Sequence, residues 1–224
     1  TRLCNSRCTY CGIWKSRNEP ELGLDAIERT FSSLRPFGLS TCYVTGGEPY
    51  ISDKVVDIAR LMHQYLPATK ISGATNGIQP KQIIGRIRKI LNIGVPVEVH
   101  VSINGGQAAH DATRGGAGFW KKAVFLLETL KSCGVPVKAA MSLMPQTIAD
   151  LPYMQKFCAD RDIGLIYSWV RQYTRYGEVD DNYSTWPEQV MPMLRRIEYV
   201  PDEFDCVGLS KRLVITPDGS LYPC

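Results

Sequence analysis

The chain has 224 residues, of which 44% are apolar and 21% charged, so it can bury the core of one or two domains. Its formal net charge of +4 is too small to indicate nucleic-acid binding. No apolar run reaches the roughly 20 residues that cross a bilayer, and no signal peptide is recognisable, so we expect a cytoplasmic protein without a membrane partner. Because it starts at Thr1, just before a cysteine motif, and stops at Cys224, we expect a chain trimmed at both ends.

Segments with helical periodicity alternate with short apolar segments along most of the chain. Helices are expected at 24–38, 53–66, 80–94, 118–134 and 147–164, and strands at 41–45, 70–75, 97–103, 137–143 and 165–170. A remnant strand is expected before the first cysteines. The alternation requires right-handed crossovers and predicts an α/β fold with a parallel sheet, either doubly wound or curled into a barrel.

Gly, Asn and Arg collect directly after the predicted strands. The segments are GGEP (46–49), NG (76–77), NGG (104–106), MPQ (144–146) and RQYTRYG (171–177). Ligands of parallel α/β folds bind at the carboxyl ends of the strands, so we expect the functional site at this edge of the sheet.

Three of the eight cysteines, Cys4, Cys8 and Cys11, lie close together near the start of the chain. Disulfide frameworks are typical of short secreted chains without a large core, and three thiols always leave one unpaired. A structural zinc site needs four ligands, usually in two pairs, whereas Cys42 lies in an apolar strand and is expected to be a buried thiol. In a cluster of four irons, three cysteines leave one iron open to a substrate.

The cysteines and the strand-end motifs together resemble the radical S-adenosylmethionine (radical SAM) enzymes. The resemblance rests on Cys4-x3-Cys8-x2-Cys11 with Tyr10 before the last cysteine, followed by GGEP, Asn-Gly, SINGG and HDATRG in that order. It covers residues 1 to about 175 and implies a partial (βα)6, TIM-like barrel.

This resemblance also implies the chemistry. Cys4, Cys8 and Cys11 would bind a 4Fe-4S cluster whose fourth iron is chelated by SAM. One electron from the cluster would cleave SAM to methionine and a 5′-deoxyadenosyl radical, which abstracts a hydrogen atom from the substrate. A low-potential electron donor such as a reduced flavodoxin or ferredoxin is the implied partner.

Four further residues would bind SAM by the same resemblance. Gly46 and Gly47 would bring their backbone against the methionyl end, where the lack of a Cβ allows close approach. Glu48 would lie beside the ammonium group, and Tyr10 would pack by the adenine. The alternative for GGEP is a tight turn between a strand and a helix.

The remaining candidates follow later strands. Ser102 and Asn104 would reach the ribose or the carboxylate of SAM. Asn76 forms either a turn or a SAM contact. Arg114 would pair with a carboxylate of SAM or of the substrate; its alternative is a surface arginine near a helix start, with Asp111 as the cap.

Other polar residues near the predicted strand ends have less defined roles. His110 is expected to be a structural hydrogen-bonding residue rather than a base. The candidates that would face the substrate, without a role that we can name, are Lys138, Trp169, Arg171 and Arg175.

The tail departs from the alternation. Two apolar segments flank PDG, which is a β-hairpin signal, and Cys206-x12-Gly219-x4-Cys224 resembles the opening of the SPASM or twitch extension. That resemblance implies an auxiliary iron-sulfur cluster with ligands beyond Cys224; the alternatives are a plain hairpin with two unrelated thiols and a disulfide. A boundary near 198–205 would separate a partial barrel (1–200) from the start of this module (201–224), which the chain's end cuts short.

The substrate is the least defined part of this interpretation. Enzymes with the extension modify peptides, sulfatases, nucleotides or tetrapyrroles. We expect a peptide or protein substrate, with a small molecule of cofactor biosynthesis as the alternative. A different class, an iron-sulfur electron-transfer or zinc-binding α/β module without SAM chemistry, stays open.

Overall fold

The computed structural model describes residues 1–15, 20–170 and 213–222. Five strands form one parallel sheet in the order β1-β2-β3-β4-β5. They are β1 (Thr41–Val44), β2 (Lys70–Thr75), β3 (Val97–Ser102), β4 (Val137–Leu143) and β5 (Gly164–Trp169). The helices are α1 (Leu24–Leu34), α2 (Lys54–Tyr65), α3 (Pro80–Asn92), α4 (Gln107–Arg114), α5 (Phe119–Ser132) and α6 (Leu151–Ala159). Short 3-10 turns occur at Ile13–Lys15, Arg35–Phe37, Pro49–Ile51 and Ile148–Asp150.

The predicted alternation of strands and helices is confirmed, but closure into a barrel is not. The sheet is open between β1 and β5 within the described residues. The remnant strand expected before the cysteines is also not found in this part of the chain. Instead, residues 1–3 run beside the loop after β1, where Gly47 N–H donates to Thr1 O and Glu48 N–H donates to Leu3 O, each over 2.7 Å.

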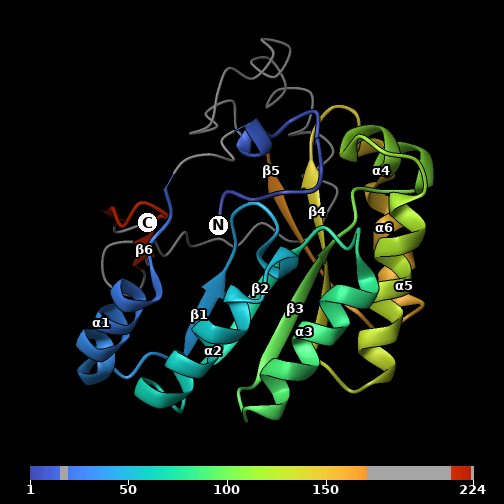
Figure 1. The fold of residues 1–224 in the computed structure, drawn as a ribbon. Coiled ribbons are helices and arrows are strands. Elements are labelled where there is room, and N and C mark those ends of the chain that lie inside the picture. Colours follow the sequence, from blue (N-terminus) through green and yellow to red (C-terminus); the bar gives the residue numbers. More distant parts are fainter. Residues whose placement is uncertain (16–19, 171–212, 223–224) are drawn as a thin grey trace, which may run out of the picture.

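The two faces of the sheet differ in chemistry because side chains alternate along each strand. On β3, Val97, Val99 and Val101 are at most 4% exposed and belong to the core, where α3 and α5 cover the strand. Glu98 and His100 point to the opposite face. Figure 1 shows the helices beside the sheet and the N-terminal loop, in blue, across the ends of the strands. The sheet therefore has an apolar face under the helices and a polar face opposite to it.

Helix α4 was not predicted as a separate element. It is short and ends at Gly115, which takes a left-handed conformation with a φ of 76°. The side chain of Asp111, within α4, accepts the N–H groups of Gly118 and Trp120 and so satisfies the first turn of α5. Asp111 thus caps a helix start, as the alternative interpretation of this segment had it, and Arg114 is the last residue of α4.

The predicted hairpin is present as β6 (Val214–Ile215) and β7 (Leu221–Tyr222), paired antiparallel. It docks on the N-terminal part of the chain, as the red segment beside the blue one in Figure 1 shows: Leu22 N–H donates to Pro217 O over 2.6 Å, and Arg2 pairs with Asp218 over 3.1 Å. The predicted boundary at 198–205 lies outside the described residues, as do Arg171, Arg175, Cys206 and Cys224. In the described part of the chain, no helix combines the length and apolar character that membrane crossing requires.

Candidate functional site

The loop that carries the cysteines is held against the carboxyl ends of the strands by its neighbours. Gly46 has a φ of 124°, and a Cβ atom on it would lie 2.0 Å from Thr1 O. A Cβ atom on Gly47 would lie 2.0 Å from Leu3 O. These glycines let the segment before Cys4 approach the loop after β1, a role that the sequence did not indicate. Their predicted contact with SAM stays a prediction.

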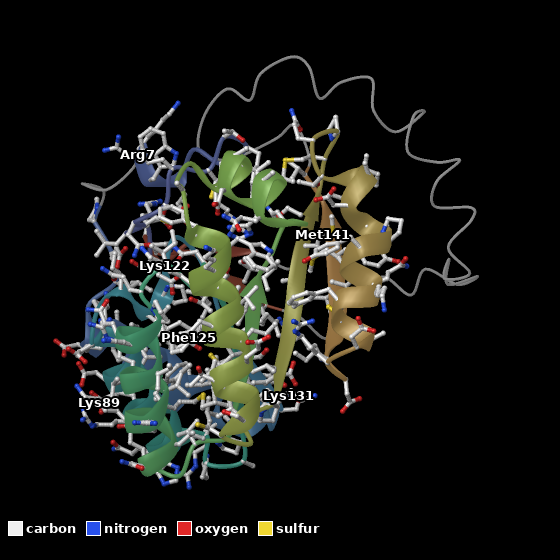
Figure 2. The ribbon with its side chains drawn as sticks, turned by 90° about the vertical axis from the view of Figure 1, so that its right-hand side faces the viewer. Arg7, Lys89, Lys122, Phe125, Lys131 and Met141 are labelled. Atoms are coloured by element: carbon white, nitrogen blue, oxygen red, sulfur yellow. The ribbon has the colours of Figure 1, made fainter. Side chains whose placement is uncertain are left out.

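Helix α4 holds the other side of the same loop. Thr9 N–H donates to Thr113 O over 3.0 Å, and the Ser6 hydroxyl donates to Arg114 O over 3.0 Å. A Cβ atom on Gly115 would lie 2.6 Å from Arg7 O, so this close approach requires a residue without a side chain. Figure 2 shows Arg7 at the end of the molecule opposite to Lys89 and Lys131, which mark the last turns of α3 and α5. Backbone groups of the loop after β1 and of the end of α4 thus form hydrogen bonds with the cysteine loop and the residues before it.

The three thiols lie in a largely water-excluded environment. Cys4 and Cys8 are 9% exposed, and Cys11 is partly buried. Burial raises the pKa of the Cys4 and Cys11 thiols above their usual range. Polar groups contact the sulfur atoms: Ser6 N–H donates to Cys4 Sγ over 3.4 Å, and the Ser6 hydroxyl oxygen, whose hydrogen points to Arg114 O, lies 3.2 Å from Cys8 Sγ. Ser6 was not predicted, because a serine between two cysteines carries no signal of its own.

Arg114 is buried beside the cysteines, and the alternative of a surface arginine is wrong. It is 8% exposed, its Nη1 lies 3.7 Å from Cys8 Sγ, and its guanidinium stands over the ring of Tyr10 at 5.7 Å. Its Nη2 donates to Asn104 Oδ1 over 3.3 Å, while its buried Nε has no partner. Within the described residues, no carboxylate forms an ion pair with this cation.

Asn104 connects Tyr10 to the end of the sheet. It is fully buried, and its amide donates to the Tyr10 hydroxyl over 2.9 Å and to Thr113 Oγ1 over 3.3 Å. Its carbonyl accepts Ser142 N–H over 3.1 Å. Burial raises the pKa of Tyr10 to about 12, so its hydroxyl stays protonated. Ser142 was not predicted, because only the fold brings β4 beside Asn104.

Glu48 is a buried carboxyl group that accepts hydrogen bonds from three donors. It is 1% exposed and accepts the N–H groups of Tyr50 and Asn76 over 3.1 and 2.7 Å, and the Thr75 hydroxyl at both oxygens over 3.0 Å. Burial raises its pKa to about 7 even though these donors favour the ionised form. The group is therefore poised to change charge near neutral pH.

Asn76 and Ser102 occupy the ends of the neighbouring strands. The Asn76 amide donates to Asn5 Oδ1 over 2.8 Å and lies 3.9 Å from Cys4 Sγ, while its carbonyl accepts Ile78 N–H over 2.9 Å. Asn76 thus forms a turn and also contacts the cysteine loop. Ser102 is half-buried at the end of β3. Contact of either residue with SAM stays a prediction.

His110 supports the network from α4. It is fully buried, and its Nδ1 accepts Asn104 N–H over 3.1 Å. Burial and the nearby charge of Arg114 lower its pKa to about 3, which keeps the ring neutral. The expected structural hydrogen bond of His110 is confirmed.

The residues around the thiols fit an anionic iron-sulfur group. A buried cation without a direct ion pair is costly, and in the described residues Arg114 is such a cation beside Cys8, with Glu48 acting on it only at longer range. A cluster with thiolate ligands, or the carboxylate of SAM, would supply a negative charge in direct contact with it. In the described residues, no three His, Cys, Asp or Glu side chains surround a single metal-ion position. A cubane cluster needs no such position, because each of its cysteines binds a different iron.

Several proteins of known function have sequences similar to this chain. The chain is 25% identical over 250 residues to the antilisterial bacteriocin subtilosin biosynthesis protein AlbA of Bacillus subtilis (strain 168), covering 100% of the chain and 53% of AlbA. It is 26% identical over 170 residues to the pre-heme d1 synthase of Dinoroseobacter shibae, covering 75% of the chain and 41% of that enzyme. A GTP 3′,8-cyclase of Listeria welshimeri is 24% identical over 228 residues, covering 98% of the chain and 64% of the cyclase. The chain spans about half the length of these relatives.

Solved structures show the same fold. Streptococcus suis SuiB bound to S-adenosylmethionine matches with a TM-score of 0.73 at 14% identity, covering 100% of the chain and 58% of SuiB. Native anSMEcpe with bound AdoMet matches with a TM-score of 0.69 at 20% identity, covering 88% of the chain and 57% of that protein. A family model described as the radical SAM superfamily matches residues 1–158. The chain therefore belongs to the radical SAM superfamily.

Proposed function

We propose that Cys4, Cys8 and Cys11 hold a 4Fe-4S cluster and that SAM binds between this loop and the strand ends. The observation that carries the proposal is the buried guanidinium of Arg114, which lies 3.7 Å from Cys8 Sγ with an unpartnered Nε. When bound, the cluster supplies the electron for reductive cleavage of SAM, which gives the enzyme a radical that removes a hydrogen atom from its substrate. Reduced flavodoxin or ferredoxin is the proposed electron donor.

The side chains around the loop position SAM and exclude water in this proposal. Arg114 pairs with the SAM carboxylate, and Glu48 in its ionised form accepts the ammonium group. Tyr10 packs by the adenine. Gly46 and Gly47 provide a bare backbone at the methionyl end, and the remaining proposed contacts come from Asn76, Ser102 and Asn104. The apolar core behind β3 keeps these polar groups in a rigid setting.

The test is production of 5′-deoxyadenosine. The chain is reconstituted with iron and sulfide without oxygen, then given dithionite and SAM, and the product is measured by chromatography. We expect formation by the unmodified chain and by Cys133→Ala, which removes an exposed thiol at the end of α5. Cys8→Ala should abolish it. Equal yields from Cys8→Ala and the unmodified chain would refute the proposal.

We further propose that the substrate is a peptide. AlbA is named for the biosynthesis of the bacteriocin subtilosin, and SuiB has been crystallised with its precursor peptide SuiA; both matches extend over the whole chain. The second candidate is a small molecule of cofactor biosynthesis, which the pre-heme d1 synthase and GTP 3′,8-cyclase relatives favour. Deuterated candidate peptides distinguish the two. Transfer of deuterium into 5′-deoxyadenosine would show that hydrogen is abstracted from the peptide.

An auxiliary cluster held by Cys206 and Cys224 belongs to the same proposal. The hairpin before Cys224 docks beside Arg2, two residues before the first cysteine of the loop. Such a cluster needs further ligands from beyond Cys224. Iron analysis of a longer chain that includes them should give more than four irons per molecule, and a value of four would refute this part of the proposal.

A further inference from the structure

Three polar side chains form a hydrogen-bonded chain on the sheet face opposite the helices. The Tyr43 hydroxyl lies 3.2 Å from His100 Nδ1, and His100 Nε2 lies 2.7 Å from Glu98 Oε1. Tyr43 is on β1 and the other two are on β3, so the tyrosine reaches across β2. Its partner in register on β2 is Ser72, which is small enough to leave this path open.

The direction of these hydrogen bonds follows from the charge on Glu98. His100 and the ammonium groups of Lys138 and Lys70 lower the pKa of Glu98 to about 2, and the two lysines lie 3.1 and 3.2 Å from its oxygens. An ionised carboxylate can only accept, so His100 Nε2 carries the hydrogen. Nδ1 of the neutral ring is then an acceptor, and Tyr43 donates its hydroxyl hydrogen to it.

The exposed fractions of Tyr43 and His100 differ as expected for a proton relay with one outer and one inner group. His100 is 8% exposed and therefore inaccessible to a large substrate, whereas Tyr43 is 50% exposed and presents the outer end. The charged and polar groups that face His100 are Tyr43, Ser72, Glu98 and Lys138, and Lys70 faces it through Glu98. A proton that arrives on His100 is thus stabilised by the carboxylate.

The three hydrogen-bonded side chains lie close to the candidate site along their strands. Tyr43 lies three residues before Gly46, and His100 lies two residues before Ser102, so both strands lead directly from the relay to the loops at the strand ends. On the same sheet face, the register neighbours that lead toward the strand ends are small: Ala74 lies beside His100 on β2, and Ala140 lies beside Ser102 on β4, one step beyond Lys138. A substrate lying on this face could contact Tyr43 and still approach the strand ends.

We propose that Tyr43, His100 and Glu98 form a proton relay that takes a proton from an N–H, O–H or S–H group of the substrate. The Tyr43 oxygen accepts the substrate proton while its own hydroxyl proton moves to His100 Nδ1, which leaves an imidazolium beside the Glu98 carboxylate. No electrons are transferred in this step, and His100 later returns the proton to solvent. The relay rests on the proposed function, because radical enzymes that form new bonds to such groups must also remove their protons.

The test uses the acid-base property of the relay and needs neither SAM nor a cluster. In p-nitrophenyl acetate, an attacking tyrosine oxygen bonds to the acetyl carbon, and the ester C–O bond breaks with its electron pair on p-nitrophenolate. The tyrosine proton must leave in this step, and His100 is placed to accept it. Peptide mapping by mass spectrometry then measures acetylation at each tyrosine of the 224-residue chain.

Tyr153 on α6 is an internal control, because it is 44% exposed against 50% for Tyr43 but contacts the ring of Phe157, with no hydrogen bond to a base among the described residues. Burial and the charge of Glu98 raise the pKa of Tyr43, so without a relay it should react more slowly than Tyr153. With the relay, we expect acetylation of Tyr43 at pH 7 to be at least about 10-fold faster than that of Tyr153.

Variants separate the relay from simple accessibility. His100→Gln and Glu98→Gln should remove the rate advantage of Tyr43 and leave Tyr153 unchanged, which also shows that the fold persists. Ser72→Ala, which removes a hydroxyl 3.5 Å from His100 Nε2 outside the chain of donors, should keep the advantage. Equal rates at Tyr43 and Tyr153, or an advantage that survives His100→Gln, would overturn the relay. Neither result depends on whether SAM is cleaved.

Discussion

At the scale of single residues, the site combines groups that are readable from the sequence with groups that only the fold supplies. Tyr10, Asn104 and Arg114 belong to motifs in the sequence, and the structure brings them together beside Cys8. Ser142 joins them through Asn104 from β4, 38 residues further along. Serine is common in every kind of segment, so its role there depends on strand register, which a single sequence does not specify.

Glu48 should make the stability of the chain without cofactors depend on pH. Its pKa is about 7 in the folded state against a usual value of 4.5, so the folded state binds this proton more tightly than the unfolded state. The stability that Glu48 contributes is fully present below pH 4.5. It is lost as the pH rises through 7, by roughly 3 kcal/mol in total at about 1.4 kcal/mol per pH unit. Urea unfolding at pH 5 and pH 8 measures the loss. Glu48→Gln should show a much smaller difference, and an equal difference in both proteins would contradict this account.

Asn104 should be among the costly polar residues to truncate. Asn104→Ala leaves the Ser142 N–H and the buried Tyr10 hydroxyl and Arg114 guanidinium with fewer partners, so we expect a loss of about 2 to 4 kcal/mol in the free energy of unfolding. Asn104→Asp keeps an acceptor for Arg114 and should lose less. Asn92→Ala, at an exposed position at the end of α3, should change stability by less than about 0.5 kcal/mol. Denaturant titration ranks the three, and a loss for Asn104→Ala as small as that for Asn92→Ala would argue against the network.

At the scale of elements, close backbone approach positions the cysteine loop. The sequence marks GGEP as a turn or a ligand contact, but it does not show that residues 1–3 lie against the glycines. That approach joins segments more than forty residues apart, and local patterns carry no information about such contacts. Helix α4 was missed for a related reason: it has only eight residues, and much of its stability comes from its contacts with the loop and α5.

Gly47→Ala tests this approach. The added methyl group would meet the Leu3 carbonyl oxygen at 2.0 Å, and backbone must move to relieve it. We expect a loss of at least about 2 kcal/mol and a disturbed environment of Cys4. Gly85→Ala is the matched control, because Gly85 is exposed within α3 with nothing within 4 Å of an added Cβ, and it should stabilise the chain by about 0.5 to 1 kcal/mol. Thermal unfolding measures the stability change in both variants. Equal changes in Gly47→Ala and Gly85→Ala would contradict the described contact.

At the scale of the whole molecule, the α/β alternation and the parallel sheet could be predicted because hydrophobic periodicity repeats five times with short connections. Whether the sheet closes could not, because the period of a strand pattern is the same in an open sheet and in a barrel. The docking of the hairpin on Arg2 and Leu22 was equally unpredictable, since it joins the two ends of the described chain.

Asp218→Ala should loosen this docking without unfolding the molecule. Asp218 pairs with Arg2 and also accepts Ser220 N–H and the Thr216 hydroxyl. Its side chain is 42% exposed, so we expect little change in the melting temperature. Amide hydrogen exchange at Leu22, whose N–H donates to Pro217 O, should become several-fold faster. Asp160→Ala, which removes an exposed ion pair on α6, should leave that exchange unchanged, and unchanged exchange in Asp218→Ala would refute the coupling.

The central claim is that three cysteines hold a cluster with one iron left for SAM. Electron paramagnetic resonance of the reconstituted, dithionite-reduced chain tests it most directly, recorded with and without SAM. We predict a reduced-cluster signal that changes shape when SAM is added and that is absent from Cys4→Ala, Cys8→Ala and Cys11→Ala but retained in Cys133→Ala. A signal that SAM does not alter, or one that survives loss of Cys8, would contradict the account.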